Sequence, residues 1–448
     1  MIKTHEWNNG FRLIYEKPNS NAHISSIYTI CDIGSAHESD DVRGGAHFIE
    51  HMCFKGTKKV PKTEDVYVQY DDIGAYMNAF TEKRYTTFRL RVHDQYVENC
   101  VHLMGDMLMN SVFHASEFKK EEKVVIEEVM RLQDSAETIL GDLKDSVVYK
   151  NSSYEYSIDT LSYHKRPFSY NKILELYRAF YRPDRMILSV ISNVPFANVV
   201  KMIDGSFYAK SHASNPRLDA ILQTNVIRYS DISQMEPSYH LEKHANISTI
   251  HMNITFRTCN YYSDDKYILD LLKHCLSGAF GSRLSMLLRD KNGLTYHSTI
   301  TTNYYEHSGD FSFYAQLNPS KILKNDSNPG VLPLIIGLLN DLVKDGVGKK
   351  ELDTAKRNIK GKLLIVLEQS DSQSVHNGVD YLMKSDASKI TPLNKVYERH
   401  LKPITTTQVA EAIRKYLKPS AMNVFIIGNE IPDVKSVKKC CEEFTQIR

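Results

Sequence analysis

The sequence has no long apolar run and no excess of charge of either sign. No stretch approaches the roughly 18 consecutive apolar residues of a transmembrane helix, so we expect no membrane span. Lys and Arg number 56 against 54 Asp and Glu, which gives a formal net charge of +2. This balance provides no electrostatic reason to expect nucleic acid or an anionic membrane as a partner.

A disulfide pattern is also missing. The cysteines are odd in number and include an adjacent pair, and none of them form a Cys-x-x-Cys motif, which argues against a disulfide framework. The N-terminal segment "MIKTHEWNNGFRLIYEK" has neither an apolar signal core nor an Arg/Ser-rich presequence. We therefore expect the cytoplasm or another reducing compartment, rather than the mitochondrial matrix. The seven cysteines are Cys31, Cys53, Cys100, Cys259, Cys275, Cys440 and Cys441.

Two segments half a chain apart resemble each other. Residues 24–27 in "HISSIYTICDIGS" align with residues 247–250 in "NISTIHMNITFR", an offset of 223 in a chain of 448. Two unrelated strands of similar composition would look alike too, but an offset of half the chain favours duplication. Each half mixes alternating strands with amphipathic helices, which predicts an α+β fold. A Ser-, Asn- and Pro-containing stretch separates the halves, so we expect domains at 1–210 and 241–448 and a linker at 211–240.

The segment "GGAHFIEHMCFKGT", residues 44–57, places two histidines and a glutamate within five positions. On a helix, His47, Glu50 and His51 fall within an arc of about 100°. The apolar residues on the other side are Phe48, Ile49, Met52 and Cys53. Flanking glycines are consistent with a short helix. A charged surface helix is the alternative interpretation.

The spacing suits a zinc site. Histidines four residues apart lie one turn above each other and can reach one tetrahedral metal. Zinc lowers the pKa of a bound water from about 15.7 to about 7, so Glu50 can serve as the base that takes its proton. The order of residues is the inverse of the HExxH arrangement.

A third ligand is expected on the helix predicted at residues 117–134. Glu121 and Glu128 lie within about 20° of each other on that helix, on a stripe with Val124, Val125, Val129 and Leu132. A carboxylate in an apolar stripe needs a metal or an ion partner, whereas Glu122 and Glu127 lie off the stripe. A salt bridge to a buried Lys or Arg is the alternative. We predict Glu128 as the ligand and Glu121 as the carboxylate that orients the site.

"HFIEHMCFKGT" closely resembles the signature of the pitrilysin/insulinase metallopeptidases, in particular the mitochondrial-processing-peptidase-like branch. The resemblance covers nearly the whole chain through "NNGFRLIYEK", "DIGSAHES", "GAYMNAFTEKRYTTF", "EKVVIEEV", "FYRPDRMILSVISNV" and "SGAFGSRLSMLLRDKNGLTYHS". It implies two similar halves, each an antiparallel sheet flanked by helices, in a clamshell around a central chamber. It also implies one zinc ion per chain, on His47, His51 and Glu128, with the glutamate 81 residues beyond the first histidine.

The resemblance implies further roles. Arg289 and Tyr296 would reach the substrate and the developing oxyanion, and Asn78 would bind the substrate backbone beside an edge strand. From the residues alone, a surface Arg and a half-buried strand Tyr would be the simpler interpretation. The chain departs from the family pattern at Ile191, Ser192 and Asn193, where a glycine is usual. It also lacks the glycine-rich loop of the non-catalytic processing-peptidase subunit, which favours a catalytic chain.

We therefore expect a zinc metalloendopeptidase that hydrolyses short or unfolded peptides. The alternative is a non-catalytic partner or scaffold subunit of a processing-peptidase-like complex. A homodimer or a related partner subunit is compatible with either function.

Overall fold

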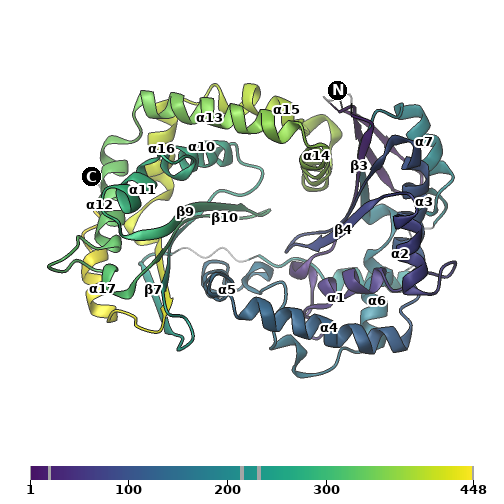
Figure 1. Ribbon diagram of the computed structural model, residues 1–448, viewed down its shortest axis with the longest axis horizontal. Coiled ribbons are helices and arrows are strands. Elements are labelled where there is room, and N and C mark those ends of the chain that lie inside the picture. Colours follow the sequence, from purple (N-terminus) through teal and green to yellow (C-terminus); the bar gives the residue numbers. More distant parts are fainter. Residues whose placement is uncertain (1, 19–21, 212–215, 230–233, 446–448) are drawn as a thin grey trace. The chain divides into compact units, whose positions relative to one another are not determined.

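The computed structural model describes residues 2–18, 22–211, 216–229 and 234–445 (Figure 1). Its chain divides into two compact units, and each unit contains pieces of both sequence halves. Unit 1 consists of Met1–Gln133, Ser152–Arg228 and Leu364–Asn394. Unit 2 consists of Asp134–Asn151, Tyr229–Leu363 and Lys395–Arg448.

Unit 1 is built on a six-stranded sheet in the order β1-β2-β6-β3-β5-β4. The β2–β6 pair is parallel and the other neighbours are antiparallel, so the sheet is mixed where we expected a purely antiparallel one. The strands are β1 (Lys3–Glu6), β2 (Arg12–Glu16), β3 (Ile24–Cys31), β4 (Tyr76–Thr81), β5 (Thr86–His93) and β6 (Met186–Ile191).

Helices cover both faces of this sheet. Side chains alternate between the faces of a strand, so Ile27 and Cys31 of β3 join the main core, whereas Tyr28 and Ile30 join a smaller cluster that includes Tyr381. The helices of unit 1 are α1 (Gly45–Cys53), α2 (Thr63–Asp71), α3 (Val97–Asn110), α4 (Ala115–Gln133), α6 (Tyr170–Phe180), α7 (Phe196–Asp204), α8 (Phe207–Lys210), α9 (Pro216–Thr224) and α14 (Ser370–Lys384).

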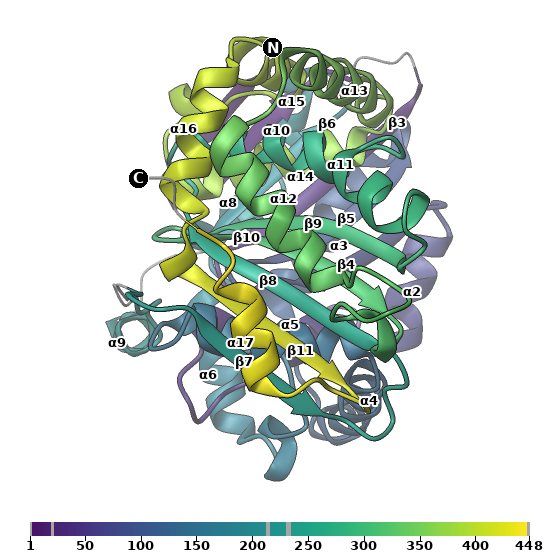
Figure 2. The ribbon, with the colours of Figure 1, turned by 90° about the vertical axis from the view of Figure 1, so that its left-hand side faces the viewer.

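Unit 2 is built on a five-stranded sheet in the order β7-β11-β8-β10-β9, with β7 and β11 parallel. Helices α10, α12, α16 and α17 cover the face turned to the viewer in Figure 2. The strands are β7 (Ser238–Lys243), β8 (Ile250–Thr258), β9 (Thr295–Tyr304), β10 (Gly309–Leu317) and β11 (Met422–Gly428). The helices that lie wholly in unit 2 are α5 (Ala136–Val148), α10 (Asp265–Ser277), α11 (Arg283–Ser285), α12 (Val331–Asp345), α16 (Thr406–Tyr416) and α17 (Val434–Cys441). Helices α13 (Lys349–Leu367) and α15 (Leu393–Val396) each cross a boundary between the units.

The two sheets share one topology, which confirms two similar α+β halves. Without β1, the strand order of unit 1 is the strand order of unit 2. Cys31 pairs with Met186 at the start of β6, and Phe256 pairs with Met422 at the start of β11. Cys31 and Phe256 are therefore equivalent positions, and their numbers differ by 225. The alignment made from the sequence used an offset of 223, so it is two residues out of register. A shift of two keeps every side chain on its face of the sheet, and the alternation in the sequence therefore cannot detect it.

Equivalent helices of the two halves are exchanged between the units. Helix α5 follows β5, α3 and α4 in the chain, as α14 follows β10, α12 and α13. Yet α14 packs on β3 and β6 of unit 1, and α5 packs on β8 and β11 of unit 2. The compact units therefore differ from the sequence-based division at 1–210 and 241–448.

The segment expected to be a linker, residues 211–240, contains helix α9 and the first residues of β7. Its residues 212–215 and 230–233 lie outside the described part of the chain. Leu218, Ile221 and Leu222 of α9 pack against the main core of unit 1. These apolar side chains explain why part of a polar connecting segment is helical.

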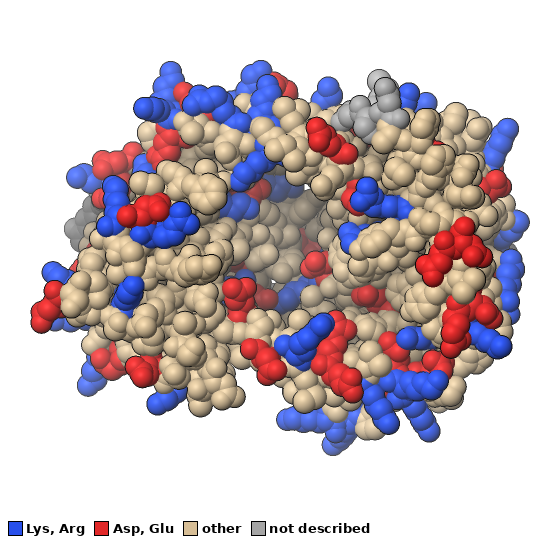
Figure 3. Space-filling model, in the orientation of Figure 1, with Lys and Arg blue, Asp and Glu red and all other residues tan. Residues whose placement is uncertain are grey.

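The surface carries charges of both signs. On the face shown in Figure 3, Lys and Arg side chains are interspersed with Asp and Glu, as the net charge of +2 leads us to expect. Among the helices that the structure describes, none combines the length and apolarity needed to cross a membrane.

Candidate metal centre

Helix α1 is fixed at its N-terminus and along its apolar face. Gly44 is the N-cap residue, with a left-handed φ of 80° that favours glycine. The carboxylate of Glu38 accepts hydrogen bonds from the backbone N–H of Gly44 (2.8 Å) and of Ala46 (2.6 Å). The predicted apolar residues Phe48, Ile49, Met52 and Cys53 are fully buried. Their packing turns the polar face of α1 toward helix α4, which contacts it.

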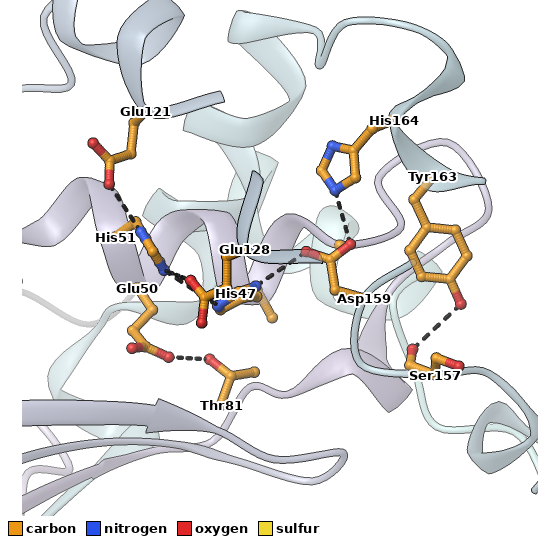
Figure 4. Close-up of polar contacts among 12 residues, drawn as sticks. His47, Glu50, His51, Thr81, Glu121, Glu128, Ser157, Asp159, Tyr163 and His164 are labelled. Carbon is orange, nitrogen blue, oxygen red and sulfur yellow. Dashed lines mark hydrogen bonds and ion pairs between the residues drawn. The ribbon is translucent and has the colours of Figure 1, made fainter. Parts of the chain in front are cut away.

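Three predicted ligand atoms converge at this contact (Figure 4). The Nε2 atoms of His47 and His51 are 3.2 Å apart. The Oε2 atom of Glu128, from α4, lies 3.4 Å from Nε2 of His51 and 4.0 Å from Nε2 of His47. Among the described residues, these three form the one group of His, Cys, Asp or Glu side chains placed to hold a metal ion.

The spacing and the hydrogen-bond roles of the three atoms suit zinc. Ligands about 2.1 Å from a tetrahedral zinc ion are about 3.4 Å from one another, close to the separations observed here. Each imidazole already has a carboxylate at Nδ1, so in the neutral rings Nδ1 carries the proton and both Nε2 atoms carry lone pairs. Two lone pairs facing each other at 3.2 Å repel, and a cation between them would remove this repulsion.

A separate carboxylate holds each of the two histidines. Glu121 lies 2.9 Å from Nδ1 of His51, and its other oxygen pairs with Lys55 at 2.6 Å. Asp159 lies 3.0 Å from Nδ1 of His47. Burial raises the pKa of Glu121, but the hydrogen bonds from His51 and Lys55 more than offset this, so its pKa is lowered and it is ionised at neutral pH.

The carboxylates give the centre a preference for positive charge. Burial lowers the pKa of His47, while the hydrogen bond to Asp159 and the charges of Asp159, Glu50 and Glu128 raise it, and the net shift is upward. A cation in the form of a proton or a metal ion is therefore stabilised at this place.

Glu50 lies beside the three ligand side chains, but its carboxylate is hydrogen-bonded to Thr81. It accepts a hydrogen bond of 2.6 Å from Oγ1 of Thr81, the last residue of β4. Burial raises the pKa of Glu50, and this effect exceeds the lowering by Thr81 and the two histidines. A raised pKa brings a carboxylate closer to the range in which a general base works best.

The apolar stripe expected on α4 is present only in part. Glu121 is buried, as are Val125 and Val129. The side chain of Glu128 is 32% exposed, and Val124 and Leu132 are exposed as well. The stripe argument therefore holds for Glu121 but is wrong for Glu128, whose place is set by the approach of α1. Glu122, which lies off the predicted stripe, accepts a 2.7 Å hydrogen bond from the backbone N–H of Phe168.

The remaining predicted residues lie elsewhere. Asn78 is exposed on β4, the last strand in the order of the unit 1 sheet, and its Oδ1 accepts from the N–H of Ala79. Arg289 and Tyr296 belong to unit 2, where Arg289 lies in the short π-helix Met286–Asp290 and Tyr296 lies in β9. They line a common cavity of about 450 Å³, and Tyr296 is 93% exposed.

Three residues of the centre were not predicted. Asp159 is 112 residues from His47 in the sequence, and His164, which contacts Asp159, lies five residues further along. Thr81 lies in the predicted substrate strand, but nothing in its spacing indicates a bond to Glu50. No periodicity connects these positions, because a loop and a strand bring them to α1 from separate parts of the chain.

Comparisons with known proteins place the chain in a peptidase family. Residues 13–160 match the family described as insulinase (peptidase family M16), and residues 167–359 match the peptidase M16 inactive domain. The chain belongs to the M16 family. A relative named an uncharacterized zinc protease, from Bacillus subtilis, is 29% identical over 388 residues, which cover 86% of this chain and 88% of the relative. The mitochondrial-processing peptidase subunit beta of Dictyostelium discoideum is 23% identical over 96% of this chain and 90% of its own.

Solved structures of other proteins share the fold. The crystal structure of a protease from Helicobacter pylori superimposes with a TM-score of 0.85 at 19% identity, covering 96% of this chain and 99% of the other. An M16-like peptidase from Alicyclobacillus acidocaldarius gives a TM-score of 0.78 at 16% identity, covering 96% and 98%. Membership of M16 and relatives named zinc proteases make this chain a zinc-peptidase homologue.

Proposed function

We propose that this chain is a zinc endopeptidase that cleaves short or unfolded peptides. The observation that carries the proposal is the convergence of His47, His51 and Glu128, with two Nε2 lone pairs facing each other and Glu50 beside them. A zinc ion held by these atoms would supply a Lewis acid that activates water and polarises a peptide carbonyl. One ion per chain is proposed, because no second such group occurs among the described residues.

Glu50 is proposed as the general base. Its carboxylate accepts the proton of the attacking water and delivers it to the amine that leaves. The hydroxyl of Thr81 fixes one oxygen of Glu50 at 2.6 Å, so the other oxygen remains for this proton. Glu121 orients His51 through the contact at Nδ1.

Peptide binding is proposed along strand β4. This strand ends the sheet order, so its outer edge can pair with an extended peptide, and it also carries Thr81. Asn78 would contact the peptide backbone. In unit 2, Arg289 and Tyr296 would bind the substrate and stabilise the oxyanion, and their exposure in a common cavity is compatible with that role.

The experiment compares the wild type with Glu50→Gln and Glu128→Gln. We expect the wild type to hold one zinc per chain and to cleave a quenched peptide until a chelator is added. Glu50→Gln should keep the zinc and lose cleavage by at least a hundredfold, the lower end of the contribution of an acid–base group. Glu128→Gln should lose both. Glu127→Gln, an exposed neighbour on α4, is the matched control and should behave as the wild type.

The same measurements test the rival function. A chain that binds no zinc and cleaves nothing contradicts the peptidase proposal and supports a partner subunit, a role suggested by the similarity to a processing-peptidase subunit. Full activity in Glu50→Gln would remove Glu50 from the mechanism. Light scattering of the purified chain distinguishes a monomer from a homodimer.

A further inference from the structure

Asp159 lies between two buried imidazoles. Its Oδ2 is 3.0 Å from Nδ1 of His47, and its Oδ1 is 2.8 Å from Nε2 of His164 (Figure 4). The side chains of Asp159 and His164 are each 3% exposed, and that of His47 is 13% exposed. Each carboxylate oxygen thus has one imidazole partner in a site closed to water.

The second imidazole is held by the same core that holds helix α1. The ring of His164 meets Phe168 edge to face, with centroids 5.2 Å apart. Phe168 in turn packs on Phe48 of α1 at 4.9 Å. The contacts form a closed circuit from His47 through Asp159, His164 and Phe168 back to α1. A ring of packed side chains of this kind restricts the carboxylate to one position.

The N-terminus of α1 leaves room for this carboxylate. A Cβ atom added at Gly44 would lie 3.0 Å from Oδ1 of Asp159. A larger residue at position 44 would therefore crowd this carboxylate. Glu121, the corresponding partner of His51, shares its charge with Lys55, whereas Asp159 contacts two imidazoles, those of His47 and His164.

We propose that Asp159, held in place by His164, is a positioning residue that fixes the proton of His47 on Nδ1 and directs Nε2 toward the metal. The inference rests on the proposed zinc function and names the residues that set metal affinity on the His47 side of the centre. A metal-ligating histidine whose second nitrogen is bound to a carboxylate is more basic and keeps one orientation. Loss of the carboxylate should therefore weaken metal binding without removing a ligand.

The test measures zinc affinity by competition with a chromophoric chelator, with no peptide present. Asp159→Ala and Asp159→Asn should raise the zinc dissociation constant about 10–100-fold, the usual effect of losing such a partner. His164→Phe keeps the ring and removes the N–H donor, so it should give a smaller increase. Asp106→Asn is the matched control, because Asp106 is a buried carboxylate of the same unit that binds Thr57 and Asn110 away from the centre. Its dissociation constant should stay within twofold of the wild type.

Two further readouts separate positioning from a general loss of structure. Thermal unfolding of the metal-free proteins should show that Asp159→Asn is folded, and this variant carries the test if Asp159→Ala does not fold. The visible spectrum of bound Co²⁺ should change in Asp159→Asn and not in Asp106→Asn. Wild-type zinc affinity and an unchanged Co²⁺ spectrum in folded Asp159→Asn would overturn the inference and leave the peptidase proposal standing. A wild type that binds no zinc would overturn both.

Discussion

The helix exchanged into unit 2 depends on a buried ion pair, and removing that pair should destabilise unit 2 alone. Asp310 of β10 is fully buried and lies 3.1 Å from Nζ of Lys144, a residue of α5. It also accepts hydrogen bonds from Tyr149 (2.6 Å), Asn303 (2.9 Å) and Ser312 (2.8 Å). Burial lowers the pKa of Lys144, but the charges of Asp145 and Asp310 raise the pKa by more than burial lowers it, so the amine stays charged.

The expected loss of unfolding free energy in Asp310→Ala follows from the buried charge of Lys144, which loses one of its partners. Breaking a buried pair by deleting one partner costs about 3–5 kcal/mol. Asp145 still lies 3.0 Å from Lys144 in Asp310→Ala, so we expect the lower end, about 3 kcal/mol. With a urea m-value of about 2–3 kcal/mol/M, the midpoint for unit 2 should fall by about 1–1.5 M.

The single tryptophan allows the two units to be observed separately. Trp7 belongs to unit 1, so its emission reports unit 1, whereas far-UV circular dichroism reports both units. Asp310→Ala should move the dichroism transition and leave the Trp7 transition in place. Lys120→Ala, which deletes an exposed pair with Glu117, is the control and should leave both transitions in place.

A double-mutant cycle with Lys144→Met gives the coupling energy between the two side chains. A midpoint shift below about 0.3 M in Asp310→Ala would refute the reasoning, as would an equal shift of the Trp7 transition. Either result would mean that this pair does not anchor α5 to unit 2.

Three further outcomes are expected. Burial, followed by the charge of Arg84, lowers the pKa of His37 from 6.5 to about 3. The neutral imidazole therefore contributes its full stability above pH 6.5, and this contribution is lost as the pH falls toward 3. Between pH 7 and pH 5 the unfolding free energy of the wild type should fall by about 2 kcal/mol more than that of His37→Asn. Gly378→Ala should destabilise unit 1 by about 1–3 kcal/mol in urea unfolding, because the added Cβ would lie 2.1 Å from Cδ1 of Ile30 where α14 meets β3. Gly361→Ala is the control and should not destabilise the protein, because nothing lies within 4 Å of a Cβ added there. Zinc at 100 times its dissociation constant should stabilise the wild type by about 2.7 kcal/mol in thermal unfolding, and His47→Ala should show no such gain.

The local patterns of the sequence were good guides where one element decides the outcome. The spacing of His47, Glu50 and His51 on one helix predicts which side chains share a face, and the burial of Phe48, Ile49, Met52 and Cys53 agrees with it. The same reasoning was less successful on α4. It placed Glu121 and Glu128 in one environment, yet the structure buries Glu121 and leaves Glu128 partly exposed. Helical phase describes a single element and contains no information about how far a neighbouring element extends along it.

The register of the repeat shows a second limit. Alternation of side chains predicted a strand in each of the segments that begin at His23 and Asn246, and the structure has β3 and β8 there, but the predicted alignment of the two segments is two residues out. Hydrogen bonds between strands fix the register, and these pairs connect residues that are distant in the sequence. The sequence likewise does not show the exchange of α5 and α14, because each helix has an apolar face that could pack on either sheet.

The sequence by itself determined the α+β class and the helix face that carries His47, Glu50 and His51, because both follow from short-range periodicity. It also indicated the two similar halves, through the likeness of two segments half a chain apart and the family resemblance. Only the tertiary structure decided which sheet each exchanged helix covers and which loop residue supports His47. Asp159 reaches His47 across 112 residues of chain. Contacts of that kind depend on packing between elements, and no local pattern in either segment encodes them.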